Sequence, residues 1–135
     1  MISIDGGHSP EVTAHDLLVS EGALSDGGII ILDDCFNEEW PGVVDGVQQF
    51  FSSPRSIFPF GVGEGKTFFC HQAFAQRYAA VLTAIDSKAV THEFLGSRVV
   101  CFTFRPRTLG AWIKKVDSFR MFRRAYHDAM SRWLA

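Results

Sequence analysis

The fold is decided by residues 2–34, ISIDGGHSPEVTAHDLLVSEGALSDGGIIILDD. Ile2 and Ile4 begin a short strand, which ends at Asp5 and two glycines. The next residues, Ser-Pro-Glu, supply an N-cap, an N1 proline and a first-turn acid, so a helix is predicted to follow. The aliphatic run Ile29–Leu32 is typical of a strand that is buried on both faces of a parallel sheet. Together these features predict a right-handed strand, helix, strand crossover and an α/β fold.

The composition indicates a single globular domain. Of the 135 residues, 47% are hydrophobic and 21% are charged, and the 13 phenylalanines are enough to fill a core. A net charge of −2 and a pI near 6.2 argue against nucleic acid or an anionic membrane as a partner. The cysteines, Cys35, Cys70 and Cys101, form no CxxC pair, which argues against disulfides and a zinc site and favours a cytoplasmic protein. No apolar run is long enough to cross a bilayer, and the N-terminus lacks the pattern of a signal peptide.

Beyond residue 34 the pattern continues to alternate between helices and strands. We predict helices over 40–51 and 72–85, extended stretches over 57–62 and 66–70, and a hairpin of 89–95 with 98–104. In the last part, 109–134, aromatic and aliphatic residues recur at helical spacing with lysines and arginines between them. We therefore expect an α/β domain over 1–104 and an amphipathic helical tail, 105–135, that packs on it. A tail that binds nucleic acid or a membrane surface is the less favoured alternative.

Three carboxylates stand where the two strands of the crossover end. Asp5 closes the first strand, and Asp33 and Asp34 close the second. In open α/β sheets ligands bind beyond the carboxyl ends of the strands, and neighbouring strands lie about 5 Å apart. Acids this close repel one another unless a cation lies between them, and Mg²⁺ prefers carboxylate oxygens. The sequence therefore points to a divalent-metal site formed by these residues; the alternative is that they cap helices or face solvent.

His8 is the candidate catalytic base. It follows Asp5 by three residues, so its imidazole lies near the predicted metal site and suits removal of a proton from a hydroxyl group. The alternative is a loop histidine that bonds only to backbone.

Several motifs resemble class I S-adenosylmethionine-dependent methyltransferases, and more narrowly the macrocin-type and catechol-type O-methyltransferases. They are Ile4-Asp5-Gly6-Gly7-His8-Ser9, Glu11, Asp16-Leu17, Gly27-Gly28, Ile31-Leu32-Asp33-Asp34 and Trp40-Pro41-Gly42-Val43. The resemblance extends over about residues 2 to 104 and is most specific in the first 45.

The resemblance implies that the chain corresponds to the C-terminal half of that fold. It would hold strands 4 to 7 of a Rossmann-like, three-layer αβα sheet, without the first three strands and the turn that binds the methyl donor. Residues 2–5 would be the fourth strand and 29–33 the fifth. Asp5, Asp33 and Asp34 would match the metal ligands, and His8 would match a base proposed in some relatives, whereas others use a lysine or an aspartate.

The leading hypothesis is therefore the acceptor-side part of a metal-assisted O-methyltransferase that acts on a small-molecule hydroxyl. Its cofactors would be S-adenosylmethionine and Mg²⁺ or a similar cation. Because the donor-binding half is not expected in the chain, activity of the chain alone is doubtful. The alternative is a noncatalytic assembly module that forms a homo-oligomer through an exposed strand edge. A divalent-metal hydrolase that uses Asp33 and Asp34 ranks last, because no nucleophile motif accompanies them.

Overall fold

The structure is a computed structural model and describes residues 1–103. In chain order its elements are β1 (Ile2–Ile4), α1 (Pro10–Ala23), β2 (Ile30–Asp33), α2 (Pro41–Phe50), β3 (Ile57–Gly63), β4 (Lys66–His71), α3 (Gln72–Ile85), β5 (Val90–Phe94) and β6 (Ser97–Phe102). The predicted α/β class and each element predicted before residue 103 are confirmed. The predicted helix over 109–134 lies outside the described residues.

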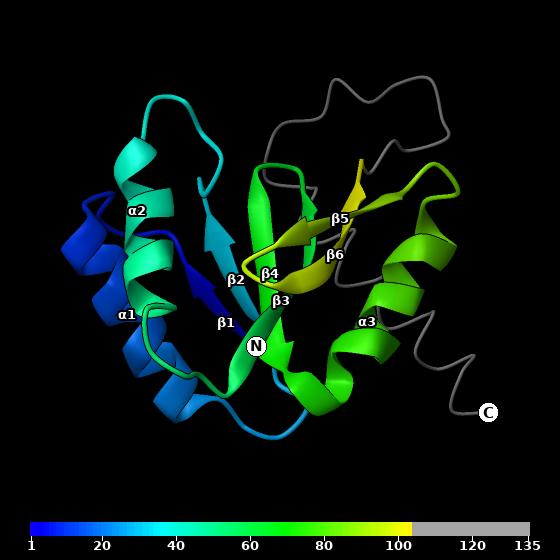
Figure 1. The fold of residues 1–135 in the computed structure, drawn as a ribbon, viewed down its shortest axis with the longest axis horizontal. Coiled ribbons are helices and arrows are strands. Elements are labelled where there is room, and N and C mark those ends of the chain that lie inside the picture. Colours follow the sequence, from blue (N-terminus) through cyan, green and yellow to red (C-terminus); the bar gives the residue numbers. More distant parts are fainter. Residues whose placement is uncertain (104–135) are drawn as a thin grey trace.

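The strands form one mixed sheet in the order β1-β2-β4-β3-β6-β5 (Figure 1). β1 pairs with β2 in parallel and β3 pairs with β6 in parallel, whereas β4 lies antiparallel between β2 and β3. β1, β2, β3 and β6 therefore point the same way and end at one edge of the sheet, the carboxyl edge. The aliphatic run of β2 is typical of a parallel sheet, but β2 is parallel only to β1 and antiparallel to β4. An aliphatic run indicates only that both faces of a strand are buried. It does not indicate the direction of the neighbouring strands, because a strand can be buried beside parallel or antiparallel neighbours.

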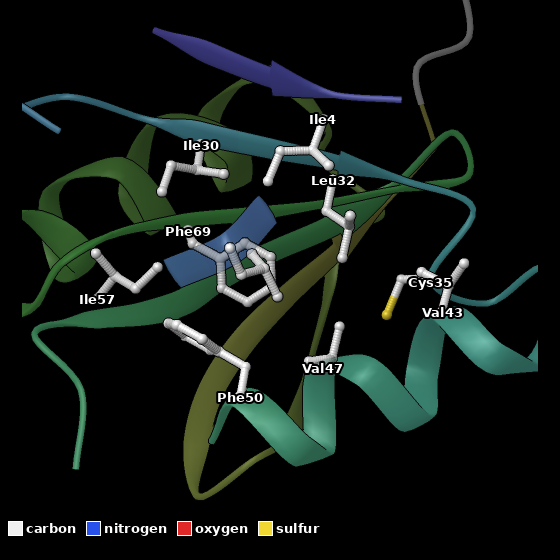
Figure 2. Packing of buried hydrophobic residues seen from close by; sticks show 10 residues of the cluster. Ile4, Ile30, Leu32, Cys35, Val43, Val47, Phe50, Ile57 and Phe69 are labelled. Carbon is white, nitrogen blue, oxygen red and sulfur yellow. The ribbon is translucent and has the colours of Figure 1, made fainter. Parts of the chain in front are cut away.

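Helices cover both faces of the sheet, which confirms the predicted three layers. α1 and α2 lie on one face and α3 lies on the other (Figure 1). On the first face, Val47 and Phe50 of α2 pack against Ile30, Ile57 and Phe69 of the sheet, as Figure 2 shows. On the α3 face, a second cluster forms from Ile29, Ile31, Phe60, Phe68, Cys70, Tyr78, Leu82, Val100 and Phe102. Among residues 1–103, no helix is both long and apolar enough to cross a membrane.

The helix pair α1 and α2 approaches closely because α2 has glycines where the two meet. A Cβ atom at Gly46 would lie 2.6 Å from the Pro10 carbonyl oxygen, and one at Gly42 would lie 2.5 Å from the His8 carbonyl oxygen. These glycines lower the helix propensity of α2. Because they carry no Cβ atom, the β1–α1 loop, which contains His8, can pack directly on the first turn of α2.

Candidate metal centre

Asp5, His8 and Asp34 converge at the carboxyl edge of the sheet. Ile4 is paired with Leu32 in the parallel β1–β2 ladder, so the residues that follow the two strands are neighbours. Each of the three side chains offers a potential ligand atom, and these atoms lie within 4.8 Å of one another. All three residues were predicted from the sequence, Asp5 and Asp34 as ligands and His8 as a base.

The backbone and side chain of Asp34 are held from several directions. Its φ of 59° lies in the left-handed region, which costs energy for a residue with a Cβ atom. Its N–H donates to the Gly65 carbonyl oxygen at 3.0 Å and to Oδ1 of Asp33 at 3.1 Å. The side-chain amide of Asn37 donates to Asp34 Oδ1 at 2.9 Å, and Asp34 Oδ2 lies 3.4 Å from His8 Nε2. The unusual conformation is thus stabilised by the bonds that aim the carboxylate at His8.

Asp33 bonds to Lys66 and lies outside this three-residue cluster. Lys66 is paired with Asp33 in the antiparallel β2–β4 ladder, and its ammonium group bonds to Asp33 Oδ2. The other oxygen, Oδ1, accepts the N–H of Asp34. In this arrangement Asp33 positions Asp34, and its predicted role as a metal ligand stays a prediction. Sequence reasoning did not foresee Lys66 here, because strand pairing between distant segments leaves no local signal.

The His8 ring is held by an aromatic neighbour. It stacks on Trp40, with ring centroids 4.3 Å apart and an interplanar angle of 17°. The His8 side chain is 29% exposed, so the ring is open to solvent on part of its surface. Trp40 was predicted only as the start of a helix. The stacking could not be predicted, because it requires α2 to pack beside the β1–α1 loop.

A small pocket lies beside the cluster. Its lining combines the charged or polar groups of the site with buried residues of the core: Ile4, Asp5, Gly6, Gly7, His8, Thr13, Leu32, Asp33 and Val43. The lining therefore brings carboxylates and an imidazole next to aliphatic side chains.

The donor set suits a hard or borderline divalent cation. The two carboxylates are ligands for Mg²⁺ or Mn²⁺ and leave coordination positions open to water or a substrate oxygen, while the imidazole of His8 beside them can serve as a base. Within residues 1–103, neither Asp5 nor Asp34 forms an ion pair with a lysine or arginine. A cation at this point would therefore neutralise two carboxylates that, within the described residues, have no lysine or arginine bound to them directly.

Comparisons with protein-family models, with curated proteins and with solved structures give no match to this chain.

Proposed function

We propose that this chain carries the acceptor-side, metal-binding part of an O-methyltransferase-like α/β domain. Its substrate would be a small molecule with a hydroxyl group, its metal Mg²⁺ or a similar divalent cation, and its methyl donor S-adenosylmethionine. The observation that carries the proposal is the convergence of Asp5, His8 and Asp34 at the carboxyl edge of β1 and β2. The resemblance of the 2–45 motifs to O-methyltransferases supports the finer assignment of methyl transfer.

In this proposal Asp5 and Asp34 hold the cation, which when bound lowers the pKa of a hydroxyl group on the acceptor. His8 removes the hydroxyl proton as general base. The Asp34 carboxylate, 3.4 Å from His8 Nε2, then forms an ion pair with the protonated ring. Trp40 keeps the ring in place by stacking. Asp33 stabilises the left-handed conformation of Asp34 by accepting its N–H, and Lys66 holds the Asp33 carboxylate in position by bonding to its other oxygen.

We also propose that four of the six strands of the described sheet, beginning with β1 and β2, correspond to strands 4 to 7 of the methyltransferase fold and that the chain alone does not bind the donor. The parallel β1–α1–β2 crossover with acids after both strands supports this correspondence. In this proposal none of residues 1–103 binds the methyl donor.

Calorimetric titration of the full chain with Mg²⁺ and Mn²⁺ tests the metal site. We expect binding of one cation, which Asp34→Asn should weaken by at least about tenfold because a charged ligand is lost. Asp45→Asn is the matched control, since Asp45 is an exposed acid on α2 away from the cluster, and it should bind as the unaltered chain does. Absence of binding, or equal binding by both variants, would refute the metal site.

Titration with S-adenosylmethionine then tests the assignment of the strands. No donor binding is expected, with or without the cation. Tight donor binding by this chain would show that the correspondence with the second half of the fold is wrong, even if the metal site is correct.

A second candidate is the assembly module, which the position of β1 favours. β1 lies at one edge of the sheet in the described residues, so Ser3, whose neighbours in the strand bond to β2, can offer its backbone groups to another strand. A stable dimer by size-exclusion chromatography, together with no response to metal, would favour this candidate over the enzyme.

A further inference from the structure

One row of side chains crosses the whole sheet on the face that α1 and α2 cover. Direct cross-strand pairs place its members on the same face: Ile4, Leu32, Thr67, Val62, Cys101 and Val90, from β1 to β5. Ile4, Leu32 and Thr67 are at most 7% exposed, whereas Val62 and Cys101 are half-buried and Val90 is 53% exposed. Burial is therefore lost along the row where the sheet passes from β4 to β3, β6 and β5.

The opposite face of the same strands shows no such loss before the last strand. There Ile31 is paired with Phe68, and both Phe68 and Val100 are paired with Gly61, so the three side chains share a face. All three are at most 5% exposed. α3 packs over this face. On the α1 and α2 side, α2 covers Ile57 at the start of β3, and Val99 of β6 is 1% exposed. Within the described residues, this burial is lost nearer the carboxyl edge, since Val62 and Cys101 are half-buried and Val90 is exposed. Val62, Val90, His92 and Cys101, which we call the open strip, remain uncovered there.

The chain itself leads from this surface into residues 104–135. β6, which carries Cys101, ends at Phe102, and Thr103 is fixed by a hydrogen bond from its N–H to Asp86 Oδ2 at 2.9 Å. The segment that follows thus starts beside Cys101 and has the length to cross the strip.

The charges of the two parts of the chain are complementary. Of the 13 lysines and arginines, eight lie in 104–135, and of the 15 aspartates and glutamates, thirteen lie in 1–103. A strongly basic segment is thus attached to a strongly acidic domain, and their opposite charges favour association of the two. Two copies of the acidic domain would repel each other, so the charges also favour the segment over a second domain as the partner.

We propose that the open strip is the docking surface for residues 104–135 of the same chain, whose aromatic and aliphatic positions cover Val62, Val90 and Cys101. The strip is then covered by the chain itself, as α1 and α2 cover β1, β2, β4 and the start of β3. The proposal is independent of the metal centre.

Limited trypsin digestion of the full chain, mapped by mass spectrometry, tests this docking. Val90→Asp places a charge in the contact and should speed cleavage at Lys114 to Arg132 by about tenfold or more, because an undocked segment is open to protease. Val19→Asp is the matched control, since Val19 on α1 is 57% exposed and lies away from the strip. It should leave cleavage within about twofold of the unaltered chain. Equal effects of the two variants, or rapid cleavage of the unaltered segment, would overturn the proposal.

Alkylation of Cys101 gives a second readout, which decides the matter if Val90→Asp unfolds the domain. Phe122→Asp should speed alkylation of Cys101, while the buried Cys35 and Cys70 stay unreactive and Phe122→Leu retains protection. Unchanged alkylation of Cys101 in Phe122→Asp would refute docking. Protection that rises with protein concentration, together with a dimer on sizing, would assign the strip to a second copy and also overturn the proposal.

Discussion

The contact between α2 and the β1–α1 loop predicts the effect of adding one methyl group at Gly42. In Gly42→Ala the new Cβ would lie 2.5 Å from the His8 carbonyl oxygen, about 0.9 Å closer than ordinary contacts, which begin at 3.4 Å. The obstructing atom belongs to the backbone, so it cannot turn away as a flexible side chain would. Either the loop or the first turn of α2 must move by most of that distance.

The energy of this shift can be bounded. Overpacking costs about 1–3 kcal/mol, whereas replacing a helical glycine by alanine returns about 1 kcal/mol. We expect Gly42→Ala to lower the free energy of unfolding by up to about 2 kcal/mol. Because the displaced β1–α1 loop also carries the proposed ligand Asp5, the shift should weaken binding of Mn²⁺ by about tenfold or more.

Gly22→Ala provides the matched control. Gly22 lies in α1, and a Cβ atom there would meet no atom within 4 Å. This variant should gain about 0.5–1 kcal/mol in the free energy of unfolding and bind Mn²⁺ as before. Urea unfolding followed by circular dichroism measures the first quantity and calorimetry the second. If Gly42→Ala matches Gly22→Ala in both, the loop does not depend on the glycine contact and the reasoning is wrong.

Two further predictions concern the hydrogen bonds of Glu21 and the buried thiol of Cys70. The Glu21 carboxylate is 13% exposed and accepts from the Ser56 N–H at 2.6 Å and the Ser56 hydroxyl at 2.8 Å, so Glu21→Ala should cost about 2–3 kcal/mol in urea unfolding. Glu38→Ala, at an exposed acid, should change the result by less than about 0.5 kcal/mol, and equal losses would contradict the role of Glu21. Burial raises the pKa of the Cys70 thiol from 9.0 to about 12, so above pH 9 the unfolded chain loses a proton that the native chain keeps. The free energy of unfolding should therefore fall as pH rises from 9 towards 12, with a smaller slope in Cys70→Ala, and identical slopes would refute the assignment.

The sequence was informative wherever structure depends on residues close in the chain. Ser9 and Pro10 start α1 as predicted, and the Ser9 hydroxyl accepts the Val12 N–H at 3.4 Å. The Ile29–Leu32 run correctly indicated burial on both faces, because burial requires only that each side chain be apolar. The direction of β4 was not predictable, since it depends on which strand is inserted beside β2.

The same distinction applies to the candidate site. Asp5 and Asp34 were predicted as neighbours because a parallel crossover brings two strand ends together, and the structure brings them together with His8. Lys66 and Trp40 were missed as site residues. Their places depend on the pairing of β2 with β4 and on the packing of α2, which are interactions between segments far apart in the chain.

The antiparallel direction of β4 has a consequence for how such an edge can change over generations. A reversed strand starts where its neighbours stop, so it delivers its opening residue, Lys66, to the place where β2 delivers its final one. The amount of positive charge beside the acids is thereby set by a codon that belongs to neither strand of the crossover. A substitution confined to that codon would alter the balance of charge while the inherited acidic residues stay as they are.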